Sequence, residues 1–182
     1  RLRQGRAALK RLALVGYTNA GKSSLLNALG RGDSRQEVLA ENKLFATLDP
    51  SSRRLRFPRD IEVIITDTVG FIRDLPKELM AAFRATLEEL ENADLLLHII
   101  DISNPRHPDQ IRSVETILAE LNLCGIPTIR VLNKMDRVVP EICDGLIQRL
   151  DGIAVSALDR STLKPLSEKM EAAVEHLYGN TA

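Results

Sequence analysis

The sequence contains a glycine-rich stretch with the spacing of a phosphate-binding loop. Residues 16–23 read Gly-Tyr-Thr-Asn-Ala-Gly-Lys-Ser, which matches the pattern G-x-x-x-x-G-K-[ST]. The glycines let the backbone wrap closely around phosphate, so that successive N–H groups and a helix N-terminus point at the anion. In this arrangement Lys22 would reach the β- and γ-phosphates of a nucleotide, and the Ser23 hydroxyl would bind Mg²⁺. An ordinary glycine-containing turn is the alternative, but the apolar run before the stretch and the helical pattern after it favour a phosphate loop. The residues expected to contact the nucleotide here are Gly16, Tyr17, Thr18, Asn19, Ala20, Gly21, Lys22, Ser23 and Ser24.

A short motif of an acid and a glycine follows a second apolar run and could hold the metal. Residues 67–70 read Asp-Thr-Val-Gly. Asp67, at the end of a strand, could hold Mg²⁺ through water, and the Gly70 N–H could donate to the γ-phosphate and move when that phosphate leaves. Taken alone the motif is weak, because Asp and Gly are common in turns. Thr47 is the first candidate for a second hydroxyl on Mg²⁺. The nearby alternatives are Thr18, Thr66 and Thr68.

Two further motifs could recognise a guanine base. Residues 133–136 read Asn-Lys-Met-Asp and residues 156–158 read Ser-Ala-Leu, each directly after an apolar run. The Asp136 carboxylate can accept hydrogen bonds from guanine N1–H and from its exocyclic amine, a pair that adenine cannot supply. The Ala157 N–H can donate to guanine O6, where adenine would present a second donor. Such polar pairing discriminates by ~10⁴ or more, which argues against an ATPase. The residues expected at the base are Asn133, Lys134, Asp136, Ser156, Ala157 and Leu158.

Apolar runs alternate with helical patterns along the chain, and this alternation predicts the elements that position the motifs. Continuous apolar strands, buried on both faces and interleaved with helices, are typical of a mostly parallel sheet. We therefore expect an α/β fold with helices flanking such a sheet. Strands are expected at 12–15, 62–66, 95–101, 127–132 and 152–155. Helices are expected at 24–29, 79–90, 111–121 and 163–177, and the polar stretch 30–44 is expected to be a long functional loop.

The composition is that of a globular domain with balanced charge. The chain has 182 residues, of which 44% are hydrophobic and 27% charged, and this argues against a disordered, collagen-like or coiled-coil chain. The 25 basic residues cancel the 25 acidic ones, so any nucleic-acid contact must be a local patch. Two cysteines and three histidines without metal-ligand spacing argue against disulfides or zinc and favour a reducing compartment. No apolar run approaches the ~20 residues of a membrane span, and we expect a cytoplasmic protein.

Taken together, the motifs resemble those of the translation-factor-related P-loop GTPases and, more narrowly, those of the HflX family. The resemblance extends over about residues 12–177, and four stretches carry the narrower assignment. These are 16–23, 44–50 (Leu-Phe-Ala-Thr-Leu-Asp-Pro), 67–76 (Asp-Thr-Val-Gly-Phe-Ile-Arg-Asp-Leu-Pro) and 86–89 (Thr-Leu-Glu-Glu), of which the second and third are long enough to be specific. The resemblance implies a P-loop NTPase G domain with a mostly parallel six-stranded sheet, and a monomeric switch that uses Mg²⁺ and converts GTP to GDP. HflX proteins bind the large ribosomal subunit and help split or rescue ribosomes, so that subunit is the implied partner.

The resemblance also implies how the chain divides. HflX proteins carry an N-terminal domain joined to the GTPase domain by a helical segment, and residues 1–11 resemble the end of that segment. The GTPase domain is then expected at 12–178, with a tail at 179–182. The chain begins at Arg1 rather than Met, which favours a fragment or a processed chain. A missing N-terminal domain would bear on whether this chain alone can act on ribosomes.

The sequence offers no obvious side chain to position the attacking water. Many GTPases place a Gln directly after D-x-x-G, but this chain has Phe71 there. Lys22, Thr47 and Gly70 are the other residues expected to act in GTP hydrolysis. Without a residue to orient the water, hydrolysis is expected to be slow unaided and to depend on a partner or an added cation. In related GTPases with Asn at the position of Asn19, this side chain helps to hold K⁺ beside the phosphates, where the ion would offset developing charge. The alternative is that Asn19 only shapes the loop, because Asn tolerates unusual backbone angles.

Other interpretations stay open at this point. A GTP-gated binding module with negligible hydrolysis would suit Phe71, and the G domain of another K⁺-dependent GTPase, of the tRNA-modification or iron-transport type, would suit Asn19. His98 lies within an apolar strand and is expected to be a buried core residue. A basic run is either a solvated strand face or a contact with ribosomal RNA phosphate. Its members are Arg53, Arg54, Arg56 and Arg59.

Overall fold

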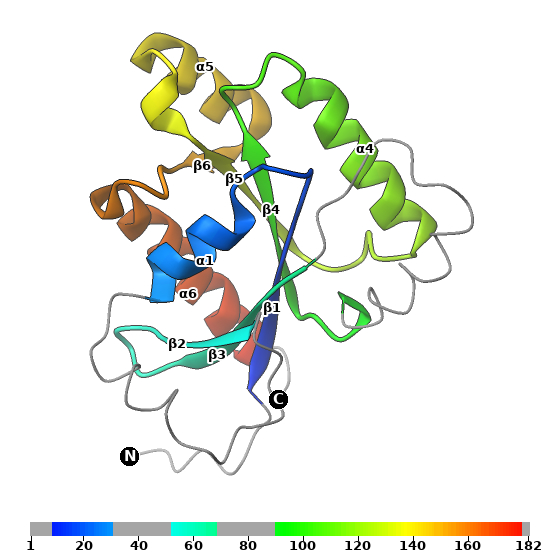
Figure 1. Ribbon diagram of the computed structural model, residues 1–182. Coiled ribbons are helices and arrows are strands. Elements are labelled where there is room, and N and C mark those ends of the chain that lie inside the picture. Colours follow the sequence, from blue (N-terminus) through cyan, green and yellow to red (C-terminus); the bar gives the residue numbers. More distant parts are fainter. Residues whose placement is uncertain (1–8, 31–51, 69–89, 180–182) are drawn as a thin grey trace.

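The structure is a computed structural model that describes residues 9–30, 52–68 and 90–179 (Figure 1). Strands and helices alternate along the chain. The strands are β1 Lys10–Gly16, β2 Ser52–Arg56, β3 Glu62–Asp67, β4 Leu95–Asp101, β5 Thr128–Asn133 and β6 Gly152–Ala154. The helices are α1 Lys22–Gly30, α4 His107–Glu120, α5 Pro140–Leu150 and α6 Lys164–Gly179, together with the short 3₁₀ helices η2 Met135–Arg137 and η3 Arg160–Leu163.

The strands of the described residues form one sheet in the order β2-β3-β1-β4-β5-β6. β2 runs antiparallel to β3, whereas every other neighbouring pair is parallel. β1 lies between β3 and β4, and its residues 12–16 are all buried. A strand covered on both faces must be apolar throughout, which is why its sequence shows no alternation. The mostly parallel six-stranded sheet that we expected is therefore confirmed.

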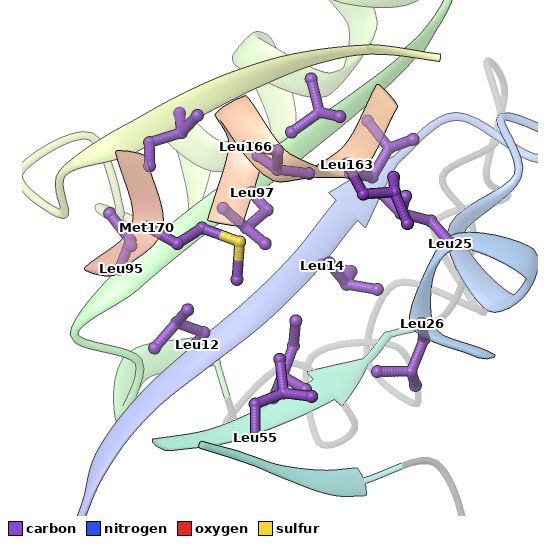
Figure 2. Packing of buried hydrophobic residues seen from close by; sticks show 14 of the residues in the cluster. Leu12, Leu14, Leu25, Leu26, Leu55, Leu95, Leu97, Leu163, Leu166 and Met170 are labelled. Atoms are coloured by element: carbon purple, nitrogen blue, oxygen red, sulfur yellow. The ribbon is translucent and has the colours of Figure 1, made fainter. Parts of the chain in front are cut away.

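Helices cover both faces of this sheet, with α1 and α6 on one face and α4 on the other (Figure 1). Leu97 of β4 packs in one cluster with Leu25 of α1 and Met170 of α6 (Figure 2). Its neighbour Leu96 points to the opposite face and lies in a cluster with Val114 of α4. Within the described residues, no helix is both long and apolar enough to cross a membrane.

β2 and α5 do not show in the apolar patterns of the sequence, and β2 was expected only through the interpretation of the basic run as a solvated strand face. β2 has the sequence Ser-Arg-Arg-Leu-Arg, and only Leu55 of it is buried, because the strand lies at the sheet edge. α5 buries only Cys143 and Leu146, so its apolar stripe is too sparse to mark a helix. β1 also begins earlier than expected, since Lys10 and Arg11 of the segment that resembles a helical linker are its first two residues.

Candidate nucleotide-binding site

The phosphate loop and the two base motifs meet in one cavity of about 490 Å³ at the carboxyl ends of β1, β5 and β6. Ligands of open α/β sheets bind at this end of the strands, where loops lead into helices. All but one of the lining residues are among those expected from the sequence, and the addition is Arg137. The lining residues are Asn19, Gly21, Lys22, Ser23, Ser24, Asn133, Lys134, Asp136, Arg137, Ser156, Ala157 and Leu158.

The backbone of the phosphate loop explains its residue types. Gly21 has φ +96°, and a Cβ there would lie 2.3 Å from Asn133 Nδ2. A Cβ on Gly16 would lie 2.6 Å from the carbonyl oxygen of Ile99 on β4. Asn19 has φ +65°, a left-handed conformation that Asn adopts more readily than most residues. The loop therefore needs glycine at two positions and uses Asn19 at a third for a backbone reason.

Lys22 and Ser23 open α1 beside the end of β3. Lys22 is buried, and burial lowers the pKa of its ammonium, while the charge of Asp67 acts in the opposite direction. The Ser23 hydroxyl donates a hydrogen bond to Asp67 Oδ2 at 2.6 Å. The other carboxylate oxygen, Asp67 Oδ1, is buried and has no hydrogen-bond partner in the described part of the chain. A charged buried oxygen without a partner is costly, so this atom calls for a cation or a donor.

This pair of oxygen ligands fits Mg²⁺. Mg²⁺ prefers hard oxygen ligands and is held in nucleotide sites by one or two protein oxygens together with water and phosphate. No group of three or more His, Cys, Asp or Glu able to hold a metal occurs in the described residues, and a site of this kind does not require one. Ser23 and Asp67 are two of the three Mg²⁺ ligands that the sequence predicts, and the structure places them in contact with each other.

The structure shows which groups two of the candidate threonines contact. The Thr66 hydroxyl pairs with Ser52 Oγ of β2 at 2.9 Å. The Thr68 hydroxyl donates to the carbonyl oxygen of Leu14 at 2.6 Å. Two of the three alternatives to Thr47 are therefore engaged in contacts with the sheet, and the third, Thr18, lies in the phosphate loop. Thr47 itself, Gly70 and Phe71 lie outside the described residues, so their roles stay predictions.

The two base motifs contact each other across the ends of β5 and β6. The Ser156 hydroxyl donates to Asp136 Oδ1 at 2.7 Å, which fixes the orientation of the carboxylate. Ser156 is only 1% exposed, and its own N–H donates to Thr162 Oγ1 at 2.8 Å. The hydroxyl of Ser156 also accepts from the Leu158 N–H at 3.3 Å. Asp136 is thus an exposed residue whose carboxylate is oriented by a buried serine.

Asn133 connects the phosphate loop to the base motifs. Its side chain is 1% exposed, and Nδ2 donates to the carbonyl oxygen of Ala20 at 2.9 Å. Its Oδ1 accepts from the Ala157 N–H at 3.4 Å, a long hydrogen bond. The Ala157 N–H expected to serve guanine O6 is therefore already directed at a neighbouring acceptor. Asn133 fixes the loops that form the cavity.

Asp101 and Ser103 also belong to this region, although no sequence motif predicted a role for them. Lys134 Nζ donates to the carbonyl oxygen of Asn19 at 3.0 Å and to Asp101 Oδ2 at 2.9 Å. The other oxygen, Asp101 Oδ1, accepts from the N–H and the hydroxyl of Ser103 at 3.0 and 2.5 Å. Burial alone would raise the pKa of Asp101, but Ser103 and Lys134 together hold it below the usual value. An Asp at the end of a buried strand with a Ser two residues later is the only signal that the sequence offered.

A second cavity of about 400 Å³ lies near the amino end of β5 and is not joined to these motifs. His98 of β4 lines it and is 3% exposed. Burial lowers the pKa of His98 to about 4, and the charge of Arg130 on β5 adds to this. His98 is thus a neutral buried residue, as its apolar surroundings predicted.

The basic run lies along β2 and the turn that follows it. Arg54 forms an ion pair with Glu62, and Arg56 pairs with Asp60. Arg59 pairs with Glu175 of α6 at 2.9 Å. Much of the positive charge is therefore balanced within the domain, which favours the solvated strand face over a dedicated phosphate contact.

Comparison with known proteins provides a separate line of evidence. A family model described as "50S ribosome-binding GTPase" matches residues 11–134. A protein named GTPase HflX from Magnetococcus marinus is 47% identical over 164 residues, which are 90% of this chain and 37% of that protein. GTPase HflX from Alkalihalophilus pseudofirmus is 45% identical over 173 residues, which are 95% of this chain and 39% of that protein. The crystal structure of a GTP-binding protein from the hyperthermophilic archaeon Sulfolobus solfataricus in complex with GDP has a TM-score of 0.74 and 28% identity, and the match covers 92% of this chain and 53% of that chain. The chain thus spans less than half the length of these two HflX relatives.

Proposed function

The chain belongs to the family of 50S ribosome-binding GTPases, as a GTPase domain of the HflX type, and from this premise we propose that it binds guanine nucleotide and hydrolyses GTP. The observation that carries the proposal is the single cavity that Lys22 and Ser23 share with Asp136 and Ala157. One end of this cavity offers donors and positive charge for phosphates. The other end offers the acceptor that a guanine base requires, and guanine O6 would replace Asn133 Oδ1 as the partner of the Ala157 N–H.

Each end of the cavity has a definite task in this proposal. At the phosphate end, Lys22 and the N-terminus of α1 neutralise the anion, and the left-handed Gly21 turns the backbone around it. Burial of Lys22 strengthens this attraction, because less water screens the charge. Ser23 and Asp67 would hold Mg²⁺, which when bound neutralises charge at the β- and γ-phosphates.

At the base end, Asp136 selects guanine. Ser156 holds one oxygen of its carboxylate at 2.7 Å, so the acceptor is oriented before the base arrives. Adenine carries an unprotonated N1 and a C–H where guanine brings two donors, so it would leave the Asp136 carboxylate unpaired. Polar pairing of this kind supports a preference for GTP over ATP of ~10⁴ or more.

Hydrolysis without help is proposed to be slow. The position after D-x-x-G is Phe71, which cannot hydrogen-bond a water molecule. A group supplied by a partner can add ~10³–10⁵ in rate, and a K⁺ ion near Asn19 would offset charge in a comparable way. The same Phe71 favours the second candidate function, a GTP-gated binding module whose hydrolysis is negligible.

The partner that we propose is the large ribosomal subunit. The description of the matching family and the HflX names of the relatives support this choice. Because the chain spans less than half of those relatives, splitting or rescue of ribosomes is proposed for the full-length protein rather than for this domain alone. A ribosomal partner would place the protein in the cytoplasm.

The base assignment is tested by replacing Asp136 with Asn. The carbonyl oxygen of the introduced amide would still accept from Ser156, while its NH₂ group would donate to the oxygen that xanthine carries in place of the guanine amine. We expect Asp136→Asn to weaken GTP binding roughly tenfold to a hundredfold, the effect of one lost hydrogen bond to a charged group, and to admit xanthosine triphosphate. The measurement is a competition titration against a fluorescent GDP analogue, with the exposed Asp144→Asn of α5 as the matched control. A variant that still prefers GTP would show that Asp136 does not contact the base.

A further inference from the structure

Asp101 ends β4 next to the nucleotide cavity but does not line it. Its backbone is in register with Asn133 on β5, so its side chain lies beside the first residues of the base motif. The carboxylate forms an ion pair with Lys134 at 2.9 Å, in which the side chains of Asp101 and Lys134 are 13% and 25% exposed. An ion pair that is this well shielded from water is screened less than a surface pair.

Both oxygens of the Asp101 carboxylate are engaged by donors of the protein. Oδ1 accepts from the N–H and the hydroxyl of Ser103, and Oδ2 accepts from Lys134 Nζ. Ser103 therefore holds the carboxylate in one orientation, and in that orientation the second oxygen faces the ammonium. The negative charge at this point is fixed in place.

Lys134 connects the Asp101 carboxylate to the phosphate loop. Its backbone is left-handed at φ +64°, and its Nζ donates to the carbonyl oxygen of Asn19, itself left-handed at φ +65°. Without the Asp101 charge, the ammonium would keep only one neutral acceptor among the described residues and would lose the counter-charge that offsets its burial. One ion pair thus connects the loops that follow β1, β4 and β5.

We propose that Asp101 is a positioning residue for nucleotide binding, which acts by holding Lys134 against the Asn19 carbonyl and so fixing the phosphate loop relative to the base motif. This inference rests on the proposed function, because it names a residue that supports the same guanine-nucleotide site. It assigns no contact between Asp101 and the nucleotide. GDP and GTP should depend on Asp101 equally, since the contact does not involve the γ-phosphate.

The test compares the affinity of the 182-residue chain for GDP and GTP in four proteins: wild type, Asp101→Asn, Lys134→Met and the double variant. We expect Asp101→Asn to weaken both nucleotides roughly tenfold to a hundredfold, as for the loss of one hydrogen bond between charged groups. In the Lys134→Met background, Asp101→Asn should have no further effect, because the two residues act as one unit. A general loss of stability would not produce this dependence on Lys134.

The control is Asp109→Asn, which removes an exposed ion pair with Arg112 on α4 and should leave affinity unchanged. If Asp101→Asn does not fold, Ser103→Ala serves instead. This substitution leaves the Asp101 charge in place and removes the hydroxyl, one of the two Ser103 donors that orient the carboxylate. The nucleotide affinity of Ser103→Ala should also fall, but by less than that expected for Asp101→Asn. The inference is overturned if Asp101→Asn binds as tightly as Asp109→Asn, if its effect persists in full with Lys134→Met, or if the substitute Ser103→Ala binds like wild type. A wild-type chain that binds neither GDP nor GTP would instead overturn the proposed function.

Discussion

At the scale of single residues, Asn19 combines a backbone requirement with a proposed role in holding K⁺. Its φ of +65° means that Asn19→Ala would strain the loop and confuse the two roles. Asn19→Gly keeps the left-handed backbone and removes only the amide. We expect GTP turnover of the wild type to be faster in KCl than in NaCl, and Asn19→Gly to turn over equally in both salts. The matched control is Asn122→Gly, another left-handed Asn (φ +58°) outside the site, which should keep the difference between salts. A K⁺ effect that persists in Asn19→Gly would reject the ion-ligand role.

Residue types and spacing predicted which side chains line the cavity but not the contacts that hold them in place. Lys22, Asp67 and Asp136 lie in short motifs, and the order of these motifs along the chain is sufficient to identify them. Asp101 is 33 residues away from Lys134 in sequence, and only the register of β4 and β5 shows that they meet. Long-range pairs of this kind leave no local pattern in a single sequence.

At the scale of secondary-structure elements, His98 makes the packing of β4 sensitive to pH. The unfolded chain protonates this residue below its usual pKa of 6.5, whereas the folded chain resists protonation until its pKa of about 4. The unfolded state therefore binds more protons between these values, and the free energy of unfolding must fall as the pH is lowered through this range. The full shift corresponds to roughly 3 kcal/mol, lost once the pH lies below both pKa values. Arg130, which pairs with Glu115, lies opposite His98 and adds to the effect.

The measurement is urea unfolding of wild type and His98→Gln at pH values between 7 and 4. Carboxylates titrate in the same range, so the quantity of interest is the difference in slope between the two proteins. The wild type should lose more stability on acidification than His98→Gln does. His176→Gln changes an exposed histidine of α6 and should behave as the wild type. Equal slopes for wild type and His98→Gln would show that His98 is not held neutral by the fold.

The elements differ in how far the sequence could predict them, and burial explains the difference. β1, β4 and β5 are covered on both faces, so their apolar runs mark them clearly. Among the described strands, β2 pairs on only one side, and the charges of its arginines are met by acids elsewhere in the fold. No apolar run therefore marks it, and only its basic run suggested a solvated strand face. The stretch 30–44 was expected to be a loop. Gly30 is the last residue of α1, and residues 31–44 lie outside the described part of the chain, so the expectation for them stays a prediction.

At the scale of the whole molecule, the proposed partner can be tested because this chain spans only part of its HflX relatives. Slow intrinsic turnover, which Phe71 leads us to expect, leaves room for a partner to supply a catalytic group worth ~10³–10⁵ in rate. We therefore expect large ribosomal subunits to raise the GTP turnover of the 182-residue chain, and small subunits at the same concentration to serve as the control. Stimulation by the large subunit alone would mean that this domain carries part of the docking surface. Unchanged turnover, with GTP affinity intact, would contradict that view and assign the docking contacts to parts of the full-length protein outside this domain.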